Sequence, residues 1–330
     1  MTVSEQIRRI KNAKAAIKQA IQNKGVTVSD TAKLNEYPAL IDSISGGSGG
    51  DSIDVGYWPN FFELKTKNYT DLQYVFAYLQ VKNTDKDIIS LIENFDTSKV
   101  DDIGNAFYQF GYFSTSYYPD LDLTKWNIEK VDNVQQAFYF CKAKNLNISG
   151  WKFTKATSMY QFMYYFYGTT VNASNCYTSN ITNMYYCFGN CDSLVSLDIT
   201  GWDTSKATTM GYMFYGDKKL VSITGEIDAS SVTTFSSMFY NCNALETVYL
   251  KNICKDSTVT NHNNFSIDLG KTKVKDECLI YIINELPDLA AKGLTATDKI
   301  VLTLPPSNTL TAEQVQVAIS KGWTVANTTY

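Results

Sequence analysis

Residues 202–214 read WDTSKATTMGYMF, and this pattern of residue types recurs along the middle of the chain. Phe214 ends the stretch and is one of seven equivalent positions, which we call anchors. The anchors are Phe76, Phe107, Phe138, Met163, Phe188, Phe214 and Phe239. They are separated by 31, 31, 25, 25, 26 and 25 residues, a period typical of stacked repeats. The sequence therefore predicts one structural unit that is repeated seven times.

Apolar residues also recur at fixed numbers of residues before the anchors, and we call each set of equivalent positions a column. Residues seven, four and one position before each anchor are mostly apolar, as Ala207, Met210 and Met213 are before Phe214. These spacings of three and four predict a short helix with one apolar stripe in each unit. The column twelve positions before the anchors holds Leu64, Phe95, Trp126, Trp151, Cys176, Trp202 and Ile227.

Short alternating segments precede these stretches and predict strands. They lie at residues 121–123, 146–148, 197–199 and 248–250. No unit of this size can bury its apolar face alone, so we expect neighbouring units to stack and their strands to pair in one ladder. The expected fold class is an α/β repeat solenoid of leucine-rich-repeat-like units, each with a strand, a turn and a short helix.

Several strings in the repeats carry a family resemblance. FDTSKV, WNIEKV, WKFTKA, WDTSKA and IDASSV each precede a segment ending in MF, AF or FM, and NCDSLVSLDI and NCNALETVYL belong to the same pattern. Together they resemble the BspA-like leucine-rich repeat, a bacterial surface-protein repeat of about 26 residues. The resemblance covers roughly residues 60–255 and implies surface display and adhesion.

The repeats divide the chain into four predicted regions. We expect an amino-terminal helical arm over residues 1–45, a Gly/Ser-rich linker over 46–56, the solenoid over 57–276 and a carboxyl-terminal α/β cap over 277–330. In the cap we expect a helix at 277–286, a strand at 299–304, a helix opened by Thr311 and Gln314, and a last strand at 323–325. Residues 256–276 are polar and predict a loop or a degenerate repeat.

The arm predicts assembly or docking. A helix over residues 3–24 places apolar residues at spacings of three and four, namely at Ile7, Ile10, Ile17 and Ile21. Isoleucine at both core positions of a heptad favours three strands, so a homotrimeric stalk is one interpretation. The alternative is an amphipathic helix that packs on its own chain or on a partner. The arm also resembles amino-terminal segments of bacteriophage tail and fibre proteins, which implies docking to other virion proteins.

Composition excludes several classes of function. The net charge is −4, with 29 basic and 33 acidic residues, so no general attraction to nucleic acid is expected. No apolar run is long enough to span a bilayer, so we expect no membrane insertion. The first residues lack the apolar core of a secretion signal, which predicts synthesis in a cytoplasm. A role outside the cell would then need another exit route, such as release inside a particle by lysis, or a signal removed upstream of these residues.

No catalytic, metal or cofactor site emerges from the sequence. The single histidine, His262, lies in the polar stretch NHNN, where a surface loop is the simplest interpretation. Most of the seven cysteines fall in repeat columns, so we interpret them as small apolar core residues rather than as disulfides or metal ligands. Asp96, Asp203 and Asp228 share one column, which we interpret as a turn position rather than a carboxylate ladder for calcium or hydrolysis.

A row of tyrosines is the best candidate for a binding surface. Directly after the anchors stand Tyr108, Tyr139, Tyr164, Tyr215 and Tyr240, and the row is interrupted by Ala77 and Gly189. Stacked tyrosines offer amphipathic rings to a sugar or a protein partner. The alternative interpretation is a set of half-buried rungs that only seal the core.

These observations together predict a non-enzymatic bacteriophage virion structural protein, either a fibre or another component on the virion surface. The arm is expected to bind virion proteins, and the repeats to bind a glycan or a protein on the host surface. The alternative is a bacterial cell-surface adhesin of the same repeat family. A glycan-cleaving enzyme is a different class, which needs clustered acids in a cleft.

Deletion of residues 1–45 tests the predicted trimer. If Ile7, Ile10, Ile17 and Ile21 form the seam of a three-stranded coil, light scattering should give a trimer mass for the full chain and a monomer mass for the deletion variant. An unchanged mass in the deletion variant would show that the arm does not drive assembly.

Overall fold

The computed structural model describes residues 70–77, 79, 81, 83–112, 118–256, 265–294, 298 and 300–327. The chain divides into two compact units. One comprises Met1–Asn68 and Tyr78–Gln80, and the other comprises Tyr69–Ala77 and Val81–Tyr330. The predicted arm, its isoleucines, the linker and His262 lie outside the described residues.

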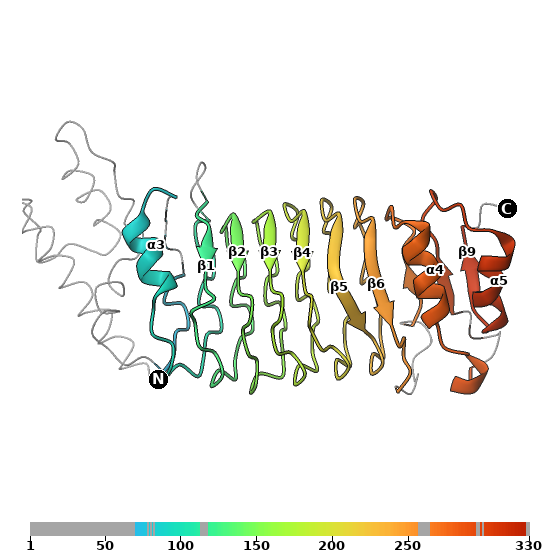
Figure 1. The fold of residues 1–330 in the computed structure, drawn as a ribbon, viewed down its shortest axis with the longest axis horizontal. Coiled ribbons are helices and arrows are strands. Elements are labelled where there is room, and N and C mark those ends of the chain that lie inside the picture. Colours follow the sequence, from blue (N-terminus) through green and yellow to red (C-terminus); the bar gives the residue numbers. More distant parts are fainter. Residues whose placement is uncertain are drawn as a thin grey trace, which may run out of the picture. The chain divides into compact units, whose positions relative to one another are not determined.

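A parallel sheet of six strands runs through the repeats, in the order of the chain (Figure 1). The strands are β1 (Leu121–Asp122), β2 (Asn145–Asn147), β3 (Thr170–Asn172), β4 (Ser196–Asp198), β5 (Ser222–Asp228) and β6 (Thr247–Lys251). Leu121, Leu146, Val171, Leu197 and Ile223 pair in one register line from β1 to β5. The expected α/β class and strand ladder are thus observed. The strands β1 to β5 each precede one of the five anchors from Phe138 to Phe239, and β6 follows the last anchor.

The expected short helices at the anchors are wrong. In the unit of Met163, the N–H of Phe162 bonds to the carbonyl of Met159 at 3.1 Å, while the N–H of Met163 bonds to the carbonyl of Cys187 in the next unit at 2.8 Å. Along this segment, one N–H group closes a tight turn and the next bonds to the neighbouring unit. The described anchor segments are therefore turns and not helices. Apolar spacings of three and four arise here because successive turns point their side chains inward.

Two residues in each of these segments have left-handed backbone conformations. They stand two positions before and two positions after the anchor, as Gln161 (φ 53°) and Tyr165 (φ 57°) do around Met163. The same pairs recur at Asn105 and Gln109, Gln136 and Phe140, Tyr186 and Asn190, Tyr212 and Gly216, and Ser237 and Asn241. A left-handed non-glycine residue costs about 1–2 kcal/mol, so the hydrogen bonds between units must stabilise this path.

The anchors form the buried centre of the stack. Phe107 and Phe138 stack with ring centroids 5.0 Å apart, and Phe214 packs between Phe188 and Phe239 at 5.7 Å from each. These rings are almost completely removed from water. Their burial supplies the main apolar stabilisation of the repeats.

The column twelve positions before the anchors adds a buried hydrogen bond to its packing. Trp126, Trp151 and Trp202 each donate their indole N–H to a carbonyl of the preceding unit, at 2.9, 2.8 and 2.6 Å. Cys176 stands in the same column and its thiol donates to Ile148 at 3.2 Å. The cysteine therefore replaces the hydrogen-bond donor of a tryptophan with a much smaller side chain.

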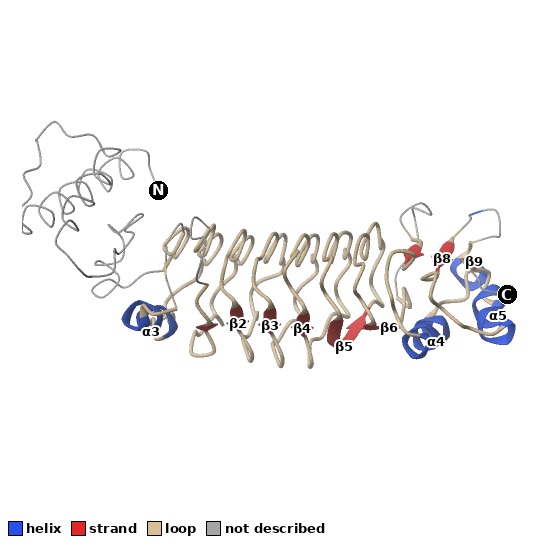
Figure 2. Cartoon of the chain, turned by 90° about the horizontal axis from the view of Figure 1, so that it is seen from above, coloured by secondary structure: helices blue, strands red, loops and turns tan. Residues whose placement is uncertain are grey.

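Helices cover both edges of the six-stranded sheet (Figure 2). The helix α3 (Lys86–Glu93) lies within the first long repeat and packs against β1, and α4 (Asp276–Glu285) packs against β6. Glu93 Oε1 also accepts the N–H of Asp122 at the β1 edge, at 2.9 Å. Such covering removes unpaired edges that could recruit other strands.

The cap contains the elements expected from its sequence. Besides α4 it has a short 3-10 helix η5 (Ala290–Lys292), a strand β8 (Val301–Thr303), a helix α5 (Ala312–Ser320) and a strand β9 (Thr324–Ala326). The predicted capping box is present, with Thr311 and Gln314 each bonding the other's backbone N–H. The strand β7 (Ile267–Asp268) in the expected polar loop pairs with β8, giving a parallel sheet in the order β7-β8-β9.

None of the helices in the described ranges is both long and apolar enough to cross a bilayer.

Candidate functional site

The tyrosines after the anchors form a continuous row of contacting rings, which we call the tyrosine ladder. It consists of Tyr74, Tyr108, Tyr139, Tyr164, Tyr186, Tyr215 and Tyr240. Successive ring centroids lie 5.8, 5.3, 5.6, 4.9, 6.1 and 5.3 Å apart. All five tyrosines predicted from the sequence therefore lie in one row.

The two interruptions in the predicted row are filled from another position. Ala77 and Gly189 replace the tyrosine in their units, and both units carry a tyrosine two positions before the anchor, Tyr74 and Tyr186. A Cβ atom on Gly189 would lie 2.7 Å from the Tyr186 ring and 3.2 Å from the Tyr164 ring. Glycine thus provides the space in which Tyr186 continues the ladder.

The stacking limits what the ladder can bind. Tyr108 and Tyr139 are parallel within 2°, and Tyr215 and Tyr240 within 13°, so these rings cover one another's faces. At these two pairs a sugar cannot stack on the faces that are already covered. The rings of Tyr164 and Tyr215 instead meet the Tyr186 ring edge to face. Burial of the side chain, with neighbouring tyrosines, raises the pKa of Tyr186 to about 12, so its hydroxyl stays protonated at neutral pH.

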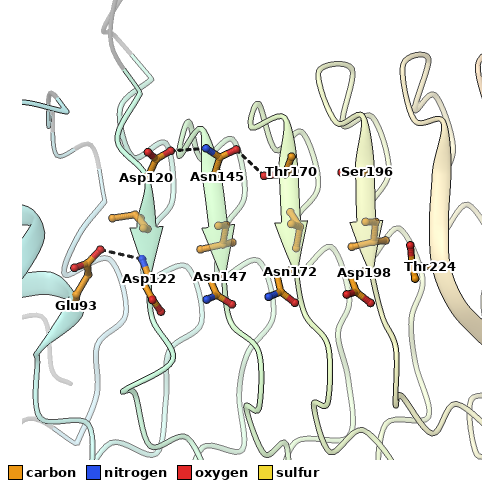
Figure 3. A pocket seen from close by; sticks show the side chains of 14 residues that line it. Glu93, Asp120, Asp122, Asn145, Asn147, Thr170, Asn172, Ser196, Asp198 and Thr224 are labelled. Carbon is orange, nitrogen blue, oxygen red and sulfur yellow. Dashed lines mark hydrogen bonds between the residues drawn. The ribbon is translucent and has the colours of Figure 1, made fainter.

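A second candidate surface is a trough of about 520 Å³ that crosses β1 to β4 (Figure 3). Its floor is the row of strand residues whose side chains point into the core, including Leu146 and Val171. One wall is formed by Asp120, Asn145, Thr170 and Ser196. The other wall is formed by Asp122, Asn147, Asn172, Asp198 and Thr224, and Glu93 closes one end. We call this surface the polar trough.

Hydrogen bonds fix the side chains of both walls. Asn145 donates to Asp120 at 2.7 Å and accepts from the Thr170 hydroxyl at 2.6 Å. In the other wall, Asn147 and Asn172 each accept a backbone N–H two residues further along the chain, at 3.2 and 3.1 Å. The trough is therefore preorganised by the same turns that end its strands.

The sequence did not single out the polar trough. Its second wall stands sixteen positions before the anchors, at Asp122, Asn147, Asn172 and Asp198. This column of Asp and Asn is visible in the repeats once the strands are aligned. The column was missed because Asp and Asn after a strand are also typical turn residues. In this structure the same side chains form the turns and line the trough.

The other predicted polar columns have structural roles. Asp96, Asp203 and Asp228 each accept the backbone N–H of the residue two positions later, at 2.9, 3.1 and 3.0 Å, which confirms the turn interpretation. All seven cysteines are buried and outside disulfides, which confirms their place in the core. Burial raises the pKa of Cys141 and Cys176 to about 12. Within the described ranges, no three His, Cys, Asp or Glu residues gather as metal ligands.

Asp217 is a buried carboxyl group that the sequence analysis missed. It stands three residues after its anchor, in the column that also holds Cys191 and Cys242, and it is completely buried. Its Oδ1 accepts the N–H of Cys191 at 2.8 Å, and its Oδ2 has no hydrogen-bond partner. The sequence did contain a signal for this site, because Asp217 is an acidic residue in a column of apolar residues.

Neighbouring units show why Asp217 can be accommodated as a neutral acid. The thiols of Cys191 and Cys242 donate to the anchor carbonyl of the preceding unit, at 3.1 and 2.9 Å. By the equivalence of the units, we infer that the corresponding acceptor for a protonated Oδ2 of Asp217 is the carbonyl of Phe188. Burial raises the pKa of Asp217 well above its usual value and the nearby Asp192 charge raises it further, which outweighs the lowering by the Cys191 N–H.

The fold and these surfaces define a class, an α/β protein in which repeated units stack through a parallel sheet. A family model described as "Mycoplasma protein of unknown function, DUF285" matches the chain twice, over residues 59–176 and 166–271. The matched residues make up more than half of the chain, and the chain belongs to this family. No curated protein and no solved structure matches it.

The substitution Asp217→Asn tests whether Asp217 is a neutral acid in the folded protein. Well below pH 3.8, Asp217 is protonated in both the unfolded and the folded state. Above this pH only the unfolded chain ionises, so the natural protein loses up to about 1.4 kcal/mol of stability for each pH unit until the raised folded pKa is reached. Thermal unfolding from pH 3 to pH 8 should therefore show an increasing advantage of Asp217→Asn as the pH rises.

The matched control is Asp203→Asn, which keeps the turn acceptor at an exposed position. A constant difference between Asp217→Asn and the natural protein over this pH range would contradict a neutral Asp217.

Proposed function

We propose that this chain is a non-enzymatic structural and binding protein of a bacteriophage virion, a fibre or another surface component, whose repeats form a solenoid of the leucine-rich-repeat type. The repeats would present a recognition surface to a glycan or a protein on the host, and the arm would dock to other virion proteins, with a homotrimer as the expected assembly. The observation that carries the proposal is the repetition of equivalent outward side chains from unit to unit, in the tyrosine ladder and the polar trough.

A binding role accounts for these two surfaces better than catalysis does. Each carboxylate of the polar trough already accepts a hydrogen bond that positions a backbone or side-chain group, as Asp198 does for the N–H of Thr200 at 2.9 Å. The buried cysteines Cys141 and Cys176 have pKa values of about 12 and do not supply a thiolate at neutral pH. Repeated, chemically similar groups suit extended recognition, whereas catalysis needs a few different groups that converge on one bond.

The alternative function is that of a bacterial cell-surface adhesin with the same type of repeat. The family description names Mycoplasma, a bacterium, and this favours a bacterial origin of the repeats. The amino-terminal arm, with its resemblance to phage structural proteins, favours the virion. Both proposals share the binding surfaces and differ in the particle that carries them.

Immunogold electron microscopy distinguishes the two locations. Antibodies raised against the full chain should label particles released from the source culture if the protein is a virion component. Labelling of intact cell envelopes without labelled particles would support the adhesin. Label confined to the interior of cells would contradict both proposals.

The variant Tyr139→Phe/Tyr215→Phe tests the tyrosine ladder as a binding surface. It keeps the ring stack and removes two hydroxyl groups, so the unfolding temperature should stay the same while binding to host cells weakens by about tenfold, as expected for two ordinary hydrogen bonds. Flow cytometry with fluorescent protein measures the binding.

The control variant is Tyr177→Phe, which removes the hydroxyl of a tyrosine that is 47% exposed and lies outside the ladder. If this control weakens cell binding as much as the double variant, or if neither does, the ladder is not the binding surface.

A further inference from the structure

The polar trough runs across the strands, so a molecule lying in it meets one pair of wall residues in each unit. The floor residues are in register from strand to strand, and the second wall follows the same register from Asp122 to Asn147, Asn172 and Asp198. Figure 3 shows these four side chains in one row, with one on each strand. The trough is therefore a periodic surface whose period is the distance between strands.

We propose that the polar trough binds a linear, uncharged polysaccharide chain that lies across the strands with about one sugar residue for each unit. The inference builds on the proposed binding function and commits to the class of ligand and to the surface that binds it. This surface shares no residue with the tyrosine ladder.

Charge excludes anionic ligands. The residues that line the trough include four carboxylates, those of Glu93, Asp120, Asp122 and Asp198, and no lysine, arginine or histidine. A phosphate backbone or an acidic glycan would meet uncompensated negative charge in this trough. The middle of the trough, around Asn147 and Asn172, is neutral.

Periodicity favours a sugar chain over an extended peptide. Adjacent strands lie about 4.8 Å apart, whereas an extended peptide advances by about 3.3 Å per residue and alternates its side chains. A peptide lying across the strands therefore loses register with the wall residues after one or two units. A pyranose linked through opposite positions of its ring advances by about one strand spacing, so each sugar can meet an equivalent pair of side chains.

The hydrogen-bonding groups of the second wall suit sugar hydroxyls. The Oδ1 atoms of Asn147 and Asn172 accept the N–H groups of Ser149 and Ser174, so the Nδ2 groups are the donors that these two side chains offer in this wall. Asp122 and Asp198 at either side of them contribute acceptors. Each sugar hydroxyl both donates and accepts, so a single chain can use the donors and the acceptors of this wall.

The variant Asn147→Asp/Asn172→Asp tests the proposal without removing the turns. Asp122 and Asp198 make the same turn bonds in neighbouring units, so aspartate is compatible with this column. The double variant loses two donors and gains two negative charges. The matched control is Asn127→Asp, because Asn127 accepts the N–H of Glu129 in the same type of turn and does not line the trough.

Titration calorimetry with the full chain should give a clear pattern. Cellotetraose should bind more tightly than cellobiose, and cellohexaose should add little, because the trough spans four strands. The double variant should weaken the binding of cellotetraose by about tenfold, as two lost hydrogen bonds predict, and Asn127→Asp should leave it unchanged.

Other outcomes contradict the inference. Hexalysine that binds the natural protein, and binds the double variant more tightly, would identify a cationic peptide as the occupant. The absence of binding by cellotetraose and by the tetramer of N-acetylglucosamine would remove the sugar assignment. Labelled virions or cells in the immunogold experiment, combined with no oligosaccharide binding, would overturn this inference and leave the proposed function intact.

Discussion

The structure depends on hydrogen bonds between the backbones of successive units. In the sheet these bonds join strands, and in the anchor segments alternate amides reach the carbonyls of the next unit, as Phe138 does to Phe162 at 2.9 Å. Such bonds form only if every unit follows the same path. This requirement explains the left-handed residues two positions before and after the anchors, which are retained even where the residue is Tyr186 or Tyr212.

Because every unit follows the same path, side chains at equivalent positions lie in columns along the stack. Inward columns stack aromatic rings, and Trp126, Trp151 and Trp202 also satisfy buried carbonyls of the unit before them. Cys176 supplies the same hydrogen bond with its thiol, whereas Phe95 and Ile227 in this column carry no side-chain donor. Asp217 can supply such a bond only as a neutral acid. The outward columns do not fill the core, so the tyrosine ladder and the polar trough are where the repeats can carry function.

Much of the architecture could be predicted from the sequence. The anchors and the tryptophan column identify the units because burial in a stack fixes residue type at a fixed period. The cap was also predictable, since Thr311 and Gln314 act locally. The short helices were mispredicted because apolar periodicity does not show where the amides bond, and in the unit of Met163 alternate amides bond to the next unit. The continuation of the ladder through Tyr186 depends on space above Gly189, which only the packed structure reveals.

The central claim is that the units are interchangeable because they hold one another through equivalent bonds. Deletion of residues 164–188 removes one full period and joins Met163 to Gly189 at equivalent positions. We expect this variant to unfold cooperatively with an unchanged circular dichroism signal per residue, whereas deletion of residues 164–176, about half a period, should abolish the folded signal. Loss of cooperative unfolding in the full-period deletion, measured by thermal circular dichroism, would contradict the claim.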